Sequence, residues 1–114
     1  MNLRFDSVVF NTRDLPRVRA FYRDVLGLKV GTFEKEGRQL PDESAKYVNF
    51  CAGDTLLCFE IGDSVETGTI VLACADLVAA KAELERAKVK LVKDHPAFLI
   101  IHDPDGREVI LQGR

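Results

Sequence analysis

The apolar positions near the N-terminus change from a strand pattern to a helix pattern at residue 14. Residues 7–11 are mostly β-branched or aromatic, which favours a half-buried strand. Asp14 is a suitable N-cap, and apolar side chains then recur at steps of three, four and three, which is one stripe of a helix. Gly27 can adopt the left-handed conformation that ends such a helix. The stripe consists of Leu15, Val18, Tyr22 and Val25.

This strand and helix pattern returns once, 62 residues further along the chain. Residues 69–73 again favour a strand, and Asp76 again precedes the first apolar position of a helical stripe. Each member of the second stripe lies 62 residues after its counterpart, as Leu77 does after Leu15. Self-similarity at a fixed offset indicates a duplicated structural unit. The second stripe consists of Leu77, Ala80, Leu84 and Ala87.

Short strands are expected in the rest of each unit. The charged residues 34–44 favour a loop, Gly53 and Asp54 favour a hairpin turn, and residues 103–106 (Asp-Pro-Asp-Gly) favour a turn shaped by the aspartate side chains. The order of a strand, a helix and three strands therefore occurs twice. It predicts one α+β domain over residues 1–114, with repeats at about 1–63 and 66–114. The further expected strands are Leu28–Glu34, Tyr47–Ala52, Thr55–Ile61, Val89–Asp94, Ala97–His102 and Glu108–Gln112.

Strand alternation assigns one face of each sheet to its helix and leaves a second face of mixed character. This second face combines apolar residues with scattered polar groups, whereas a solvated face would carry more lysine and arginine. The composition favours a small-molecule site, with plain core as the alternative. The face comprises Ser7, Val9, Asn11, Tyr47, Asn49, Cys51, Leu56, Cys58, Glu60, Thr69, Val71, Ala73, Phe98, Ile100, His102, Glu108, Ile110 and Gln112.

The charge and the cysteine content of the chain disfavour several classes of partner and site. The net charge is −2 and both signs are interspersed, which disfavours nucleic acid and acidic membrane surfaces as partners. Arg17, Arg19 and Arg23 are expected on a solvated helix face. Three cysteines without C-x-x-C spacing disfavour a disulfide framework or a thiolate zinc site. With no signal-peptide pattern in residues 1–11 and no long apolar segment, a cytoplasmic protein is expected.

The motifs of the chain resemble those of the vicinal oxygen chelate superfamily, which includes glyoxalases, bleomycin resistance proteins and extradiol dioxygenases. The resemblance rests on the strand leading to Asp14 and Leu15, on residues 21–28 (F-Y-R-D-V-L-G-L) and on the D-P-D-G turn at 103–106. It implies two tandem βαβββ modules that form a curved, barrel-like sheet cup with the helices outside. It also implies a homodimer.

Enzymes of that superfamily hold a divalent metal with four side chains, one from the first strand and one from the last strand of each module. The resemblance places these positions at Ser7, Glu60, Thr69 and Ile110, and Glu60 alone is a usual ligand. Hydroxyls are weak ligands and isoleucine is none, so no metal cofactor is expected. A divalent metal at a displaced Glu60, His102 and Glu108 site is the alternative.

The favoured function is metal-free binding of a small organic ligand or drug in the cup. Glu60 is expected to face the cup among apolar side chains with little water. The alternative is a glyoxalase-like lyase or isomerase, or a dioxygenase, which uses the displaced metal or acid–base chemistry by Glu60 and His102. A structural or regulatory dimer with a filled cup is a third possibility. The expected ligand-binding residues are Ser7, Asn11, Tyr47, Asn49, Glu60, Thr69, Phe98, His102 and Ile110.

Overall fold

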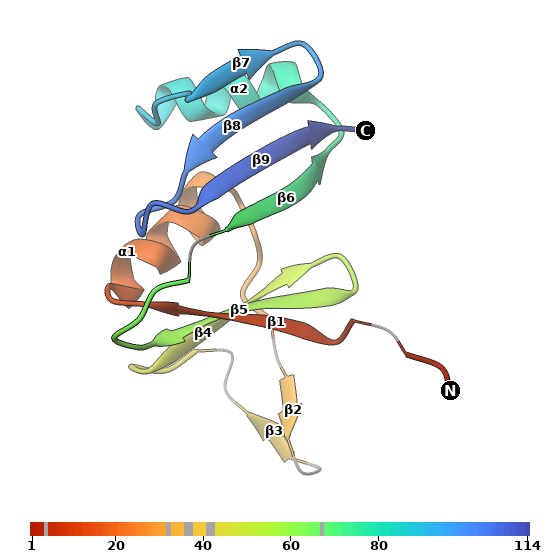
Figure 1. Ribbon diagram of the computed structural model, residues 1–114, viewed down its shortest axis with the longest axis vertical. Coiled ribbons are helices and arrows are strands. Elements are labelled where there is room, and N and C mark those ends of the chain that lie inside the picture. Colours follow the sequence, from red (N-terminus) through yellow and green to blue (C-terminus); the bar gives the residue numbers. More distant parts are fainter. Residues whose placement is uncertain (4, 32, 36–37, 41–42, 67) are drawn as a thin grey trace. The chain divides into compact units, whose positions relative to one another are not determined.

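A computed structural model describes residues 1–3, 5–31, 33–35, 38–40, 43–66 and 68–114 of the chain. It divides into two compact units, Met1–Val65 and Glu66–Arg114. Each unit contains a mixed sheet and one helical segment (Figure 1). The predicted α+β class with two βαβββ modules is confirmed. No helix in the part of the chain that the structure describes is long and apolar enough to cross a membrane.

The sheet of the first unit has the order β1-β5-β4. Its strands are β1 (Ser7–Thr12), β4 (Tyr47–Ala52) and β5 (Thr55–Ile61), as the alternation predicted. Strand β5 runs parallel to β1 and antiparallel to β4. Gly53 occupies the first position of the two-residue turn between β4 and β5 with φ of +65°, a conformation that glycine adopts without steric cost.

The helix of the first unit begins as an α-helix and continues as a π-helix. Helix α1 covers Leu15–Arg19, and the π-helical segment η1 covers Ala20–Val25. The Asp14 carboxylate accepts a hydrogen bond from the Arg17 amide at 3.2 Å, which is the predicted N-cap. The wider π turn buries both Phe21 and Tyr22, so Phe21 joins the core although the predicted stripe omitted it.

The second unit has the sheet order β6-β9-β8-β7 and the helix α2 (Leu77–Arg86). Strand β6 runs parallel to β9, which reproduces the pairing of β1 with β5. Asp76 caps α2 by accepting a hydrogen bond from the Ala79 amide at 3.0 Å. The strands are β6 (Thr69–Cys74), β7 (Lys93–His95), β8 (Phe98–His102) and β9 (Glu108–Gly113).

The helical segments of the two units end with similar C-caps, but the capping hydrogen bond of the first unit spans one more residue than that of the second. In the second unit the Val89 amide donates to the Leu84 carbonyl and Lys88 adopts φ of +59°, which is a Schellman motif. In the first unit the Leu28 amide reaches back one residue further, to the Tyr22 carbonyl at 2.9 Å. The π-helical segment absorbs this extra residue. Consequently the 62-residue offset ends here, and Ala87 is an exposed cap residue, not part of the stripe.

Two predicted strands and one predicted loop were wrong in extent. Of the expected strand Leu28–Glu34, Val30 forms a bridge with Phe50, and residues 33 and 34 belong to β2 (Phe33–Lys35). Strand β2 pairs with β3 (Arg38–Leu40), which lies inside the expected loop 34–44. Backbone pairing does not require apolar side chains, so the charged composition was misleading. Only Lys93 and Asp94 of the expected strand Val89–Asp94 lie in β7, which ends at His95, while Val89 takes part in the Schellman motif.

The buried face of each sheet packs under its own helix. In the first unit the Tyr22 ring lies 4.6 Å from the Phe59 ring and 5.8 Å from the Phe50 ring, measured between centroids. The alternation predicted these faces correctly, although Val8 remains 37% exposed near the start of β1. The most buried apolar residues are Leu15, Val18, Tyr22, Val48, Phe50 and Phe59 in the first unit, and Leu84, Leu99, Ile101 and Val109 in the second.

Candidate functional site

Strand register arranges the mixed face of the first unit in three rows that cross β1, β5 and β4. Residues directly opposite each other on paired strands lie on one face, and their side chains interact. The alternation is therefore confirmed: every residue predicted to share this face does so. The rows are Ser7–Leu56–Cys51, Val9–Cys58–Asn49 and Asn11–Glu60–Tyr47. We call the third the Glu60 row and the second the Asn49 row.

The Glu60 row brings together an amide, a carboxylate and a phenol from three adjacent strands. Asn11 and Tyr47 are half-buried, while Glu60 is exposed. The expectation that Glu60 would lie in a dry environment was therefore wrong for the isolated chain, because β5 places it near an open end of the sheet. A Cβ at Gly62 would lie only 2.7 Å from Cγ and Oδ1 of Asn11, so this glycine leaves room for the amide.

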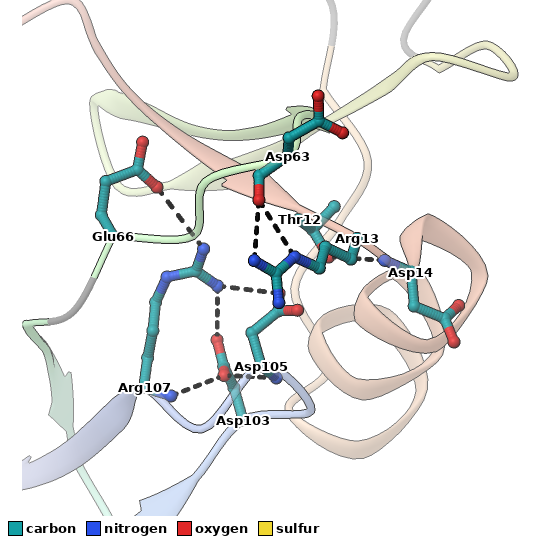
Figure 2. Close-up of polar contacts among 8 residues, drawn as sticks. All are labelled: Thr12, Arg13, Asp14, Asp63, Glu66, Asp103, Asp105 and Arg107. Carbon is teal, nitrogen blue, oxygen red and sulfur yellow. Dashed lines mark hydrogen bonds and ion pairs between the residues drawn. The ribbon is translucent and has the colours of Figure 1, made fainter.

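Backbone and side-chain contacts at the end of β1 anchor the Glu60 row. The Gly62 amide donates to the Thr12 carbonyl, and the fully buried Thr12 hydroxyl accepts from the Asp14 amide at 3.1 Å. Arg13 donates through Nε and Nη2 to the Asp63 carbonyl at 3.1 and 2.8 Å (Figure 2). These bonds tie the start of the helix to the chain that follows β5, next to the Glu60 row.

The Asn49 row is the drier part of this face. Asn49 is 3% exposed and Cys58 is 9% exposed, whereas Val9 on the edge strand is 51% exposed. Burial raises the pKa of the Cys58 thiol to about 11, and the carboxylates of Asp6 and Glu60 contribute. The thiol therefore stays protonated at neutral pH. The Nδ2 atom of Asn49 is buried and has no hydrogen-bond partner in the part of the chain that the structure describes.

The mixed face of the second unit shows the same three-row arrangement with different chemistry. The Thr69 hydroxyl donates to Oε1 of Glu108 at 3.3 Å, and His102 lies opposite Glu108 on the other side. An apolar row follows, and then a row that contains Phe98 and Gln112. The rows are Thr69–Glu108–His102, Val71–Ile110–Ile100 and Ala73–Gln112–Phe98.

Strand β7 adds two residues to this face that the sequence reasoning missed. Lys93 pairs with Ile100, and His95 pairs with Phe98. The His95 ring stacks on the Phe98 ring at 4.6 Å, and Nζ of Lys93 lies 5.6 Å from the Phe98 centroid. His95 lies just outside the expected strand Val89–Asp94, and Pro96 follows it. Two signals could have identified both residues: Lys93 and His95 are two positions apart, as on one face of a strand, and a hairpin turn follows them.

The predicted ligand-binding residues divide between the two units. Ser7, Asn11, Tyr47, Asn49 and Glu60 share the face of the first unit, and Thr69, Phe98, His102 and Ile110 share that of the second. The suggested acid–base pair of Glu60 and His102 joins different units and stays a prediction. Within its own unit, the carboxylate opposite His102 is Glu108.

The register also tests the metal positions that the resemblance implied. Ser7 pairs with Leu56 in the first unit, and Thr69 pairs with Glu108 in the second, so Leu56 and Glu108 occupy equivalent positions. Two residues further along the last strands, Cys58 is therefore the counterpart of Ile110. Glu60 is instead the counterpart of Gln112, and the two last-strand positions inferred from the sequence are not equivalent. Of these positions only the Cys58 thiol is a usual ligand of a transition metal, because hydroxyls are weak ligands and isoleucine offers none, so the set does not supply the three or four strong ligands that such an ion needs. Among the described residues, no three His, Cys, Asp or Glu side chains cluster as metal ligands.

The aspartates of the D-P-D-G turn are structural, as predicted. Oδ1 of Asp103 accepts from the amides of Asp105 and Arg107, each at 2.9 Å, and Oδ2 accepts from Nη1 of Arg107 at 3.0 Å (Figure 2). Oδ2 of Asp105 accepts from the same nitrogen at 3.0 Å, and Oε2 of Glu66 lies 3.7 Å from Nη2. Burial opposes the Arg107 charge, but the two aspartates outweigh it and raise the pKa of Arg107.

One arginine of the expected solvated helix face has a structural contact. Nε of Arg19 lies 2.6 Å from Oε2 of Glu43, and its Nη2 donates to the Ser44 carbonyl at 3.2 Å. Arg19 is half-buried, so the expectation of a solvated side chain was wrong there, while Arg17 and Arg23 are exposed as expected. The contacts hold the segment before β4 against the helix of the first unit.

Solved structures with the same fold differ in function. A lactoylglutathione lyase from Agrobacterium tumefaciens is similar with a TM-score of 0.73 at 22% identity, over 96% of this chain and 92% of that chain. The antibiotic-binding protein TnmS3 from Streptomyces sp. CB03234 is similar with a TM-score of 0.72 at 17% identity, over 98% and 96%. The fosfomycin resistance protein FosX from Listeria monocytogenes, complexed with Mn(II), is similar with a TM-score of 0.69 at 14% identity, over 98% and 91%.

These similarities show the fold alone, because all three identities are below 25%. None of the curated proteins matches the chain significantly. The family model of the Glyoxalase/Bleomycin resistance protein/Dioxygenase superfamily matches residues 4–111, which is nearly the whole chain. It agrees with the two βαβββ modules and with the motifs at residues 21–28 and 103–106. The chain therefore belongs to the glyoxalase/bleomycin resistance protein/dioxygenase superfamily.

Proposed function

We propose that this protein binds a small organic molecule on the mixed face of its first unit and does so without a metal. The observation that carries the proposal is the Glu60 row, in which a carboxylate stands between an amide and a phenol beside the apolar Val9. Small-molecule sites combine a few convergent polar groups with apolar walls in this way. An antibiotic-binding protein with the same fold supports a binding role for the scaffold.

The charge of the row indicates the ligand chemistry. Asn11 and Tyr47 are neutral, and the predicted mixed face of the first unit contains no lysine or arginine. A carboxylate in this position attracts a basic nitrogen more than an acid, and a charge-assisted hydrogen bond is among the stronger polar contacts. The favoured ligand therefore carries an amine or another basic nitrogen on an apolar body.

The binding mode is tested with two probes that differ only at the polar group, 4-ethylbenzylamine and 4-ethylbenzyl alcohol. Titrations followed by ¹H–¹⁵N NMR shifts give the dissociation constants and the residues affected. We expect the amine to bind more tightly and Glu60→Gln to weaken its binding roughly tenfold, or about 1.4 kcal/mol. Because Glu60 is exposed, the variant should keep its stability within about 0.5 kcal/mol.

The matched control is Glu83→Gln, which removes the same charge from an exposed position on α2 and should leave binding unchanged. Equal affinity of the amine for the wild type and for Glu60→Gln would refute the role of the Glu60 row. An amine that shifts no resonance of β1, β4 or β5 would refute the site.

An enzyme is the second candidate, and the Thr69–Glu108–His102 row favours it. A carboxylate that accepts from a hydroxyl and lies opposite an imidazole can transfer protons in an isomerase or lyase without a metal. Turnover of the hemithioacetal of methylglyoxal and glutathione by the metal-stripped protein, and its loss in Glu108→Gln, would favour this candidate over binding alone.

Further parts of the proposal concern assembly, metal content and location. We expect a homodimer at micromolar concentration, because the mixed faces expose apolar residues such as Val9 and Val71, and a contiguous exposed apolar face marks an interaction surface. Sedimentation equilibrium that shows only monomer would contradict this. We expect no stoichiometric transition metal by elemental analysis. The three free cysteines suit a reducing cytoplasm.

A further inference from the structure

The Asn49 side chain is a polar group in a buried position of the first unit. It is 3% exposed, and its Nδ2 atom has no hydrogen-bond partner among the described residues. Buried amide groups are almost always paired, because an unpaired donor loses its hydration without compensation. A buried amide that persists without a partner therefore points to an acceptor that comes from outside the chain.

The described neighbours of Asn49 along its row offer Nδ2 no good acceptor. Cys58 lies opposite on β5 and holds a protonated thiol, which is only a weak acceptor, and Val9 lies beyond it on β1. On the other side, the Gly31 amide donates to the Asn49 carbonyl at 2.8 Å, so that contact uses the backbone of Asn49, and Nδ2 still has no partner among the described residues. A leucine of similar size would suit this environment better for packing alone.

Asn49 also stands at a fixed place relative to the Glu60 row. Glu60 lies two residues after Cys58 on β5, so it is the diagonal neighbour of Asn49 on the same face. Diagonal neighbours on paired strands are separated by about 7–8 Å. A carboxylate and an amide donor at this spacing can contact opposite ends of one small molecule.

We propose that Asn49 selects ligands that carry an uncharged acceptor oxygen, such as a ketone or amide carbonyl, on the side opposite their basic nitrogen. The inference rests on the proposed binding function and adds to it the second polar group of the ligand. Its nitrogen would contact Glu60, its oxygen would accept from Nδ2 of Asn49, and its apolar body would lie beside Val9.

The test compares 4-(aminomethyl)acetophenone with 4-ethylbenzylamine, two amines that differ only by the carbonyl oxygen. We expect the wild type to bind the ketone about tenfold more tightly. Asn49→Leu should bind both amines equally, because it retains the size but has no donor. Asn49→Asp, which has the shape of Asn49 but only accepts hydrogen bonds when ionised, should bind the ketone more weakly than the ethyl compound.

The outcomes separate this inference from the proposed function. If the wild type binds both amines equally, the Glu60 row binds ligand but the role of Asn49 is refuted. A preference for the ketone that persists in Asn49→Leu refutes it as well. If neither amine binds, the proposed function and the inference fall together.

A measurement without ligand checks the premise. Asn49→Leu removes an unpaired buried donor, so its midpoint of urea unfolding should be equal to or higher than that of the wild type. A lower midpoint would mean that the amide already has a partner in the folded chain, which overturns the inference. Val48→Ala serves as the control for a change of packing on the opposite, buried face of β4: its urea midpoint should fall, but it should retain the preference for the ketone.

Discussion

Asp103→Ala is predicted to be among the most destabilising single substitutions in the second unit. The carboxylate of Asp103 accepts hydrogen bonds from two backbone amides of its own turn and from the guanidinium of Arg107. Arg107 is only 2% exposed. The alanine variant would leave the two amides without their acceptor, and a buried cation would keep Asp105 as its short-range partner.

The magnitude follows from the burial of the pair. Removal of one partner of a buried ion pair costs about 3–5 kcal/mol where the remaining charge is left uncompensated. Arg107 keeps Asp105 in this variant, but the two backbone amides also lose their acceptor, so we expect a loss in the same range. Domains of this size unfold with about 5–15 kcal/mol in total, so the loss is a large part of the stability. The corresponding decrease in the melting temperature is roughly 10–25 °C.

Urea unfolding followed by circular dichroism measures this loss. Asp105→Ala is the control, because Arg107 retains Asp103 in that variant, and a smaller loss of about 1–2 kcal/mol is expected. The double variant Asp103→Leu with Arg107→Leu removes both charges and should be more stable than Asp103→Ala. The reasoning is refuted if Asp103→Ala unfolds within 1 kcal/mol of the wild type, or if the double variant is the less stable of the two.

Two further predictions concern the cysteines of the first unit. Burial raises the pKa of Cys58 from 9.0 to about 11, so the unfolded chain releases the thiol proton at lower pH than the folded chain, and stability should fall as the pH rises from about 9 to about 11. The midpoint of urea unfolding should decrease between pH 8 and pH 10, and this decrease should be smaller in Cys58→Val than in the wild type. An equal decrease in both proteins would contradict the raised pKa of Cys58. Gly31→Ala would place a Cβ directly against Sγ of Cys51, and this overpacking should cost about 1–3 kcal/mol. Cys51→Ala should recover part of that loss, whereas additive losses in the double variant would show that the two positions do not touch.

The sequence alone determined the local parts of the fold. The caps at Asp14 and Asp76, the turn at Gly53 and the turn formed by Asp103 depend on residues a few positions apart, so their signals survive in the sequence. Strand alternation depends only on the period of the strand. It therefore assigned the faces correctly before any pairing was known.

Tertiary structure decided how distant residues combine. Pairing of strands far apart in the chain placed Asn11, Glu60 and Tyr47 in one row, and it made Cys58, not Glu60, the counterpart of Ile110. Register between distant strands leaves no mark at any one position, so the sequence could not give it.

Burial was likewise decided by the assembled structure. Glu60 and Asn49 belong to the same face and have the same alternation signal, yet one is exposed and the other is 3% exposed. The extra residue in the first helix was also hidden, because a π turn preserves the apolar stripe up to Tyr22 and departs from it only afterwards. The sequence alone thus determined which residues face the candidate site, and packing decided which of them water can reach.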